Sequence, residues 1–254
     1  SYIKKHCHRN KIETKFLKST HKAPTSHTVC MFEKQHERTF LYYAGANNLL
    51  DIHHFQIQKL KSIPKIMYVG YITLLGELDK FSGKNTRLSK ILIEAKKNDI
   101  ITVLDLVSNN DPSFQKVVLS ALPNTDYLLL NEIEAELLFK RPIINSKKKL
   151  NKKLITNLSK KMFLKGVKKA LIVHHSKESL YLSRDEVIHT NSTTMNKKKI
   201  INSVGAGDAF CAAFIYGIHE SWDMKTTLKK AHAAGSAMMK VDSSSGNLPN
   251  IQKL

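Results

Sequence analysis

Short apolar runs alternate with amphipathic stretches through the middle of the chain, and this alternation constrains the fold more than any other feature. The runs that predict strands are residues 65–70, 100–105, 125–130 and 170–173. Between them, apolar residues recur at helical spacing over residues 88–95 and 154–163. Continuous apolar strands separated by helices are typical of a parallel sheet that is covered on both faces. We therefore predict an α/β fold.

The N-terminal region has a different pattern. Residues 27–33 and 38–44 are strand-like, and the polar residues 34–37 lie between them. Two such runs joined by a short polar segment predict a β-hairpin. We expect this hairpin to form a small flap, at about residues 27–44, on the main body.

Size and composition agree with one domain. The chain has 254 residues, of which 42% are hydrophobic, and this suffices for one large core, so we predict that residues 1–254 form a single domain. It has no run of about 18 apolar residues, so we predict no membrane span. The three cysteines, Cys7, Cys30 and Cys211, give no disulfide framework. They fit a reducing compartment, and we predict a cytoplasmic protein.

The formal net charge of +20 would by itself suit a nucleic-acid-binding protein. The lysines are dispersed, however. Their densest runs, at residues 147–149, 152–153 and 197–199, contain no aromatic side chain on which bases could stack. We interpret these runs as solvated surfaces and expect no dedicated role in nucleic-acid binding.

The most informative segment is a glycine loop, Gly205-Ala206-Gly207-Asp208, which precedes apolar residues at helical spacing. A glycine turn that opens a helix leaves backbone N–H groups free at the positive end of the helix dipole, where phosphate oxygens bind. Asp208 could accept a proton there from an attacking hydroxyl. The alternative is that Asp208 merely caps the helix. The loop is not a Walker motif, because no Gly-Lys-Ser/Thr follows.

At these residues the chain resembles the ribokinase-like, or pfkB, carbohydrate kinase family. Residues 205–210 are similar to the C-terminal signature of that family, and Asn131 and Glu134, which follow an apolar strand, are similar to its Asn-x-x-Glu element. The resemblance implies a three-layer fold with a mostly parallel sheet and a small β lid. It implies ATP and Mg²⁺ as cofactors, with Asn131 and Glu134 organising the metal through water. It also implies that Asp208 is the general base and that Gly205, Ala206 and Gly207 form the anion hole.

Other segments extend the resemblance. Residues 231–235 are similar to the helix that lines the adenine pocket, which implies nucleotide contacts for His232 and Gly235. Residues 244–247 are similar to the last nucleotide-side loop, which implies the same for Ser244 and Gly246. The hairpin at residues 27–44 corresponds to the lid, which in this family can also form a homodimer contact.

The sequence also departs from the family pattern. We do not find the usual opening strand and Gly-Gly-rich segment with its substrate-binding aspartate, so we expect an exposed sheet edge and a substrate pocket that lacks one wall. Asn202-Ser203 stands where many members have Asp-Thr, so dependence on a monovalent cation stays open. His174 and His175 replace a Gly-containing turn that usually touches the nucleotide. Asp105 could contact a phosphate or metal, or simply end a strand.

We predict that the protein phosphorylates a hydroxyl of a small sugar or sugar-like substrate with ATP. A nucleoside kinase of the same family is an alternative, because sugar and nucleoside kinases share the ATP-binding half. A pseudoenzyme that binds nucleotide without turnover is a second alternative.

Overall fold

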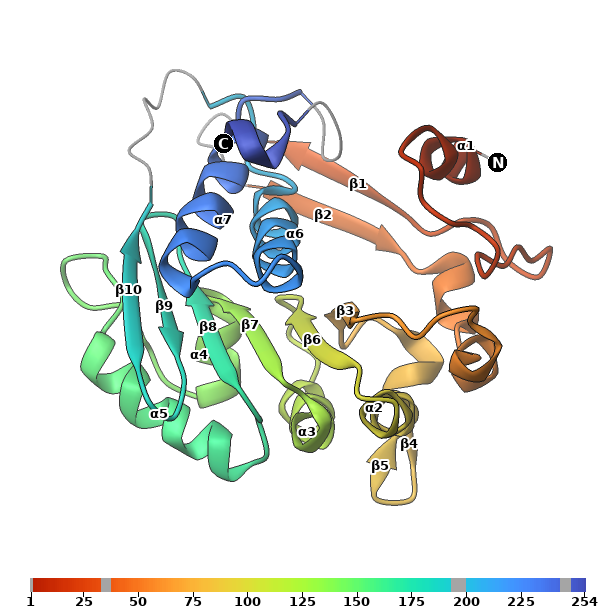
Figure 1. Cartoon of the computed structure of the whole chain (residues 1–254), viewed down its shortest axis with the longest axis horizontal. Helices are drawn as coiled ribbons and strands as arrows, with labels where there is room; N and C mark the ends of the chain where they lie inside the picture. The colour runs from red at the N-terminus through yellow and green to blue at the C-terminus, as the bar shows by residue number, and fades with distance from the viewer. Residues whose placement is uncertain (1, 33–37, 193–199, 243–247) are drawn as a thin grey trace.

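The computed structural model describes residues 2–32, 38–192, 200–242 and 248–254, and it places helices on both faces of one six-stranded sheet (Figure 1). In spatial order the strands are β10 (Val187–Asn191), β9 (Glu178–Leu182), β8 (Ala170–His174), β7 (Tyr127–Asn131), β6 (Ile101–Leu106) and β3 (Ile66–Ile72). Strands β3, β6, β7 and β8 are parallel, whereas β9 and β10 continue the sheet antiparallel. The predicted α/β fold with a mostly parallel sheet is confirmed.

The four predicted strands of the main body correspond to β3, β6, β7 and β8, whereas β9 and β10 were not predicted. Strand β9 is wholly buried, although it begins with Glu178 and Ser179. Glu178 is satisfied there, because it accepts a hydrogen bond from the Leu150 N–H at 2.8 Å and lies 2.6 Å from His189 Nε2. Because these partners lie outside the strand, the polar start of β9 could not be recognised from its own residues as part of an internal strand.

Alternate residues of each strand face opposite layers. In β7, Leu128 and Leu130 pack in the core shared with α2, α3, α4 and α5, whereas Tyr127 and Leu129 pack in the core shared with α6 and α7. The helices are α1 (Tyr2–Arg9), α2 (Arg87–Lys97), α3 (Phe114–Ala121), α4 (Glu132–Phe139), α5 (Lys152–Leu164), α6 (Ala206–His219) and α7 (Met224–Met238). The predicted helical faces at residues 88–95 and 154–163 lie in α2 and α5. Figure 1 shows α6 and α7 together on one side of the sheet.

Short elements connect the layers. The 3₁₀ turns are η1 (Gly45–Leu49), η2 (Ile52–His54), η3 (Ile57–Lys59), η4 (Gly76–Asp79), η5 (Leu122–Asn124) and η7 (Ile251–Lys253), and β4 (Phe81–Ser82) pairs with β5 (Asn85–Thr86). No helix in the described parts of the chain is both long and apolar enough to cross a membrane.

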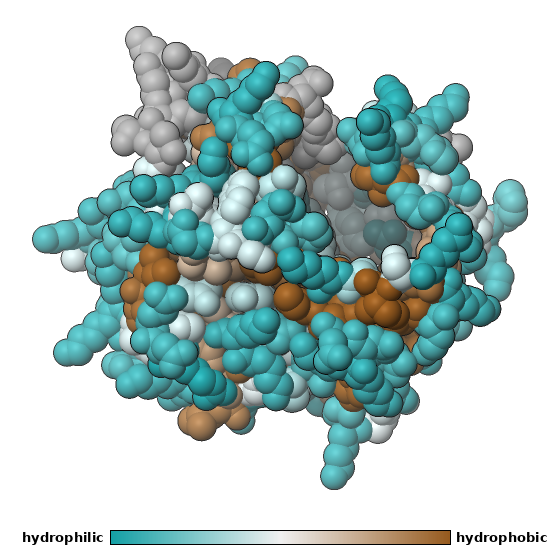
Figure 2. All heavy atoms as spheres, in the orientation of Figure 1, coloured by the Kyte–Doolittle hydropathy of each residue, from teal (hydrophilic) through white to brown (hydrophobic). Residues whose placement is uncertain are grey.

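The predicted N-terminal strands are present as β1 (His27–Phe32) and β2 (Arg38–Tyr43), which pair antiparallel in a separate two-stranded sheet. The turn between them, residues 33–37, lies outside the described residues. Apolar side chains are exposed on both strands, including those of Val29, Phe40 and Leu41. The hairpin lies apart from the strands of the main sheet in Figure 1, and Figure 2 shows the surface hollowed between the N-terminal segments and the body.

Strand β3 forms one border of the main sheet, and among the described strands it pairs only with β6. Tyr68 and Tyr71 on this strand are 41% and 46% exposed. The open edge agrees with the expectation that the sheet would expose an edge here.

Candidate functional site

A cavity of about 200 Å³ lies where the parallel strands end and α6 begins. The residues that line it come from β3, β6, β7, β8, α4 and α6, and include Tyr71, Asp105, Asn131, Glu134, His174 and Asp208. Ligands bind outside the carboxyl ends of parallel strands as a rule in open α/β sheets. The cavity therefore brings the two predicted motifs, at residues 131–134 and 205–208, to one place.

The glycine loop opens α6 as predicted. Gly205 is the residue before the first turn, and its φ of 80° is in the left-handed region that glycine adopts without strain. No side chain caps this helix, whereas Asn131, Asn151 and Asp223 cap α4, α5 and α7. Among the described residues no side chain accepts from the N–H groups of the first turn, and that of Ala206 makes only a long hydrogen bond, of 3.4 Å, to the Ser203 carbonyl, so the turn can still donate to a ligand.

Asp208 is the third residue of α6 and is exposed at the cavity. The alternative that Asp208 caps the helix is wrong, because Gly205 holds that position. Its carboxylate accepts a hydrogen bond from the Tyr71 hydroxyl, with both carboxylate oxygens at 3.0 Å from the phenol oxygen. Tyr71 was not singled out from the sequence, since it lies 137 residues away on the edge strand.

Asn131 and Glu134 form a reciprocal cap at the start of α4. The Asn131 side chain accepts from the Glu134 N–H at 2.9 Å, and Glu134 accepts from the Asn131 N–H at 2.9 Å and from its side-chain amide at 2.7 Å. Ser108 also donates to Glu134 at 3.2 Å. Glu134 is only 4% exposed, so this cap holds a buried carboxylate at the cavity wall.

Asp105, at the end of β6, is a second buried carboxylate in the same wall. It is 7% exposed and accepts a hydrogen bond from the Tyr68 hydroxyl at 3.0 Å. Burial, with repulsion from Asp208, raises the pKa of Asp105 to about 7. Burial, with repulsion from Asp105, raises the pKa of Glu134 to about 7.

These donors fit a hard divalent cation. Mg²⁺ prefers oxygen ligands and usually keeps several of its waters. Both Glu134 oxygens are already bonded to protein groups, which suits contact through water. No cluster of three His, Cys, Asp or Glu side chains that could hold a metal directly occurs in the part of the chain that the structure describes. A nearby cation would offset the repulsion between Asp105 and Glu134.

A histidine wall, formed by His174 at the cavity surface and His232 behind it, borders the same cavity. His174, at the end of β8, stacks on Phe210 with ring centroids 4.7 Å apart, and Phe210 meets His232 edge-on at 5.1 Å. His232 is 5% exposed and lies 2.9 Å from the Ser179 hydroxyl. Burial is the main cause that lowers the pKa of each histidine to about 4. Both rings are thus neutral near pH 7.

The remaining predicted residues lie around this site. Gly235 is buried in α7 behind the glycine loop, where a Cβ atom would come within 3.1 Å of the Ala206 carbonyl oxygen. The side chain of Asn202 donates to the Val241 carbonyl at 2.8 Å and accepts from the Val204 N–H at 2.9 Å. Ser244 and Gly246 lie outside the described residues. Nucleotide contacts by His232, Gly235, Ser244 and Gly246 stay predictions.

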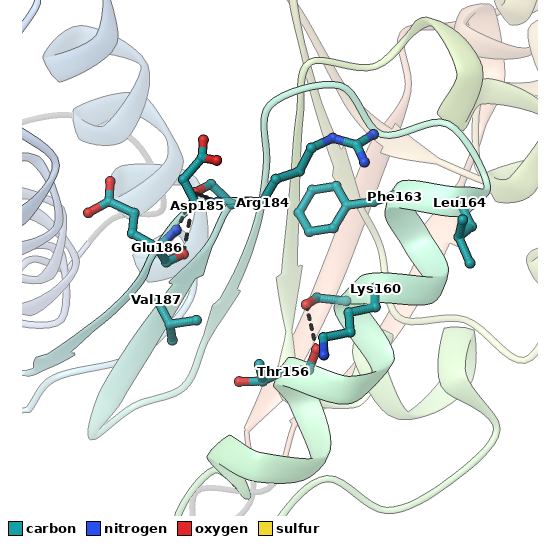
Figure 3. Close-up of a pocket in the computed structure, with 10 residues that line it drawn as sticks. Thr156, Lys160, Phe163, Leu164, Arg184, Asp185, Glu186 and Val187 are labelled. Atoms are coloured by element: carbon teal, nitrogen blue, oxygen red, sulfur yellow. Dashed lines mark hydrogen bonds between the residues drawn. The ribbon is translucent and has the colours of Figure 1, made fainter.

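A larger cavity, of about 460 Å³, lies elsewhere, between α5 and the turn that joins β9 to β10 (Figure 3). The guanidinium of Arg184 lies 5.1 Å from the Phe163 ring centroid, and Lys160, Asp185 and Glu186 add charges of both signs. This cavity contains none of the predicted motif residues. Its size alone does not make it the site, because the smaller cavity holds the glycine loop and the buried carboxylates.

Comparisons with known proteins agree with this geometry. The family model for pfkB family carbohydrate kinases matches residues 1–251. The 5-dehydro-2-deoxygluconokinase of Clostridium botulinum (strain Eklund 17B / Type B) is 25% identical over 225 residues, which are 84% of this chain and 61% of that relative. The chain therefore spans less than two thirds of the length of this relative.

Two solved structures share the fold. A nucleoside kinase of Burkholderia thailandensis in complex with inosine has a TM-score of 0.73 at 14% identity, covering 99% of this chain and 73% of that one. A putative ribokinase II from E. coli in complex with ATP and Mg²⁺ has a TM-score of 0.70 at 19% identity, covering 91% of this chain and 70% of that one. The three-layer ribokinase-like fold is thus confirmed.

Proposed function

The chain belongs to the pfkB family of carbohydrate kinases, and from this premise we propose that it transfers the γ-phosphoryl group of ATP to a hydroxyl of a small sugar. One observation carries the proposal. A carboxylate, Asp208, ends the uncapped glycine loop and lines the cavity that Asn131 and Glu134 also line. A base beside free backbone N–H groups is what phosphoryl transfer needs, because the protein mainly positions reactants and stabilises charge.

In the proposed reaction the acceptor hydroxyl oxygen attacks the γ-phosphorus, and its proton passes to Asp208. The bond from the γ-phosphorus to the bridging oxygen breaks, and ADP leaves with that electron pair. The N–H groups of Gly205, Ala206 and Gly207 stabilise the negative charge that develops on the phosphoryl oxygens. Asp208 is exposed and forms no salt bridge with another described residue, so its carboxylate is available to accept a proton.

Mg²⁺, when bound, would neutralise charge on the phosphate oxygens. Asn131 and Glu134 would hold it through water, with Asp105 as an additional carboxylate in the same wall. His174 lies close to the loop, since a Cβ atom on Gly207 would be 3.9 Å from its Cε1 atom. The neutral imidazole would border the phosphate site there without adding charge.

A sugar acceptor is supported by the family description and by the 25% identical 5-dehydro-2-deoxygluconokinase. A nucleoside acceptor has support from the fold alone, through the inosine-bound neighbour. A panel of sugars, sugar phosphates and nucleosides, with ATP consumption measured for each, would separate them. If the protein bound ATP but neither phosphorylated any compound of the panel nor hydrolysed ATP, the pseudoenzyme alternative would hold.

The hairpin formed by β1 and β2 is proposed as the lid over the acceptor. Its exposed apolar side chains could cover a bound ligand and exclude water from the reaction.

The first test replaces the proposed base. Asp208→Asn keeps the size of the side chain but cannot take a proton, so kcat should fall by about 10²- to 10⁴-fold. ATP affinity, measured by calorimetry, should change little because the loop N–H groups remain. Asp223→Asn is the matched control: it also stands at a helix start, where Asp223 accepts from the Thr226 N–H at 2.9 Å, and asparagine caps equally well. Turnover retained by Asp208→Asn would refute the assigned role.

A further inference from the structure

The hydroxyl of Tyr71 lies where an acceptor hydroxyl would have to lie. It donates to Asp208, at 3.0 Å from each of the two carboxylate oxygens. Equal distances put the phenol oxygen in front of the carboxylate, where it contacts both oxygens at once. A general base must be within about 2.6–3.2 Å of the group whose proton it takes. In this structure the group within that distance is Tyr71.

The backbone that positions Tyr71 is conformationally strained. Its φ is 60°, in the left-handed region that aromatic residues rarely adopt, and the nearby Thr73 has a φ of 85°. The pairing of β3 with β6 becomes irregular between Val69 and Ile72, and such irregularities re-aim side chains next to active sites. Asn109 fixes the turn, because its amide donates to the Thr73 hydroxyl at 2.7 Å and to the Thr73 carbonyl at 3.2 Å.

Tyr71 is a stable proton donor to Asp208. Burial and the neighbouring Asp208 charge raise its pKa above the usual value for tyrosine, so the phenol keeps its proton across the physiological range. The ring is nevertheless 46% exposed, which leaves room for the side chain to rotate away from the carboxylate.

We propose that Tyr71 is a specificity-determining residue: its hydroxyl occupies the acceptor position on Asp208, and an acceptor binds productively only by displacing it. This inference rests on the proposed function of Asp208. Asp208 is exposed, so the phenol excludes water only from the position that it holds in front of both carboxylate oxygens, which is the acceptor position. An acceptor with several hydroxyls, anchored elsewhere in the cavity, can compete.

The test is Tyr71→Phe, which keeps the ring and removes the hydroxyl. A hydrogen bond to a charged group is worth about a 10-fold change or more in an equilibrium constant, and the lower end applies to an exposed carboxylate such as Asp208. The KM for the acceptor should therefore fall by about 3- to 10-fold, while kcat changes less than about 2-fold. Hydrolysis of ATP without acceptor should rise by a similar factor, because water can then occupy the acceptor position that the phenol hydroxyl holds in the native chain.

Tyr68→Phe is the comparison variant, since it removes a phenol hydroxyl from the same strand that donates to Asp105 at 3.0 Å rather than to Asp208. It should not lower the acceptor KM. An unchanged KM and unchanged ATP hydrolysis in Tyr71→Phe, with phosphate transfer intact, would overturn this inference and leave the proposed function standing. A fall in kcat would instead make Tyr71 a helper of Asp208. If neither the native chain nor any variant transfers phosphate to an acceptor, both proposals fail.

Discussion

The two walls of the cavity bury ionisable groups of opposite kind. The carboxylate wall consists of Asp105 and Glu134, whose pKa values burial raises to about 7. The histidine wall consists of His174, which lines the cavity, and of His232 behind it; burial lowers the pKa values of both to about 4. In both walls burial favours the neutral form of the side chain. Near pH 7, however, the carboxylic acids begin to ionise, whereas the histidines stay neutral.

The consequences for stability have opposite signs. A raised carboxyl pKa stabilises the fold at low pH, and this contribution is lost as the pH rises from about 4 through about 7. A lowered histidine pKa stabilises the fold above the unfolded value of 6.5, and this contribution is lost as the pH falls toward about 4. Near neutral pH the histidine wall is thus uncharged and needs no counterion. In the carboxylate wall, ionised Asp105 and Glu134 repel each other, and a bound cation would reduce this repulsion.

The largest effect is expected for Asp105→Asn, which removes charge from the carboxylate wall. Between a pKa of 3.8 and one of about 7, each pH unit corresponds to about 1.4 kcal/mol, so the ionised carboxylate costs roughly 4 kcal/mol. The free energy of unfolding of the variant, relative to the native chain, should therefore be higher at pH 8 than at pH 4 by about that amount. Denaturant titrations in EDTA at both pH values measure it.

Asp126→Asn supplies the contrast to that experiment. Asp126, directly before β7, is also buried. Unlike Asp105, it has a cationic partner: Lys96 Nζ lies 2.6 Å from its carboxylate, and the Thr102 N–H donates to it at 2.9 Å. Removing its charge leaves Lys96 without this partner, so the variant should be less stable than the native chain at pH 8. Loss of stability in Asp105→Asn at pH 8 would contradict the account of the carboxylate wall.

A somewhat smaller effect is expected for His232→Gln in the histidine wall. The pKa of about 4 against 6.5 in the unfolded chain corresponds to roughly 3 kcal/mol, which the native chain loses between pH 7 and pH 4. The variant should lack that part of the acid sensitivity. Ser179→Ala removes the hydrogen-bond partner of His232 but keeps the imidazole. Because burial is the main cause of the shift, acid sensitivity should persist in Ser179→Ala, and its disappearance there would point to the hydrogen bond instead.

The smallest effect on stability is expected for Gly207→Ala, at the junction of the two walls. The added methyl group would have ordinary contact with His174, at 3.9 Å, and alanine favours a helix by up to about 1 kcal/mol. Thermal stability should thus hold or rise slightly, while activity falls because the methyl group narrows the phosphate site. Gly217→Ala is the converse control: its Cβ would lie 2.6 Å from the Thr227 side chain, so stability should fall by about 1–3 kcal/mol with activity per folded molecule retained.

The parts of the site differ in how far the sequence reveals them. The motifs at residues 131–134 and 205–208 are local patterns in which a helix start follows a strand or a glycine turn, so both could be located before the structure. Tyr71 and Asp105 meet Asp208 only through the order of strands in the sheet. The stack of His174 on Phe210 joins β8 to α6. No spacing along the chain encodes these contacts, because they arise from packing.

The missing cap of α6 has a consequence for the helix itself. A side-chain cap stabilises a helix by about 1 kcal/mol, and α6 begins without one. Its stability depends instead on Phe210, Phe214 and Ala213, which anchor it against the sheet. The first-turn N–H groups of α6 therefore lack a side-chain acceptor until an anion binds. Binding of that anion should stabilise α6 and, through their packing, α7 as well.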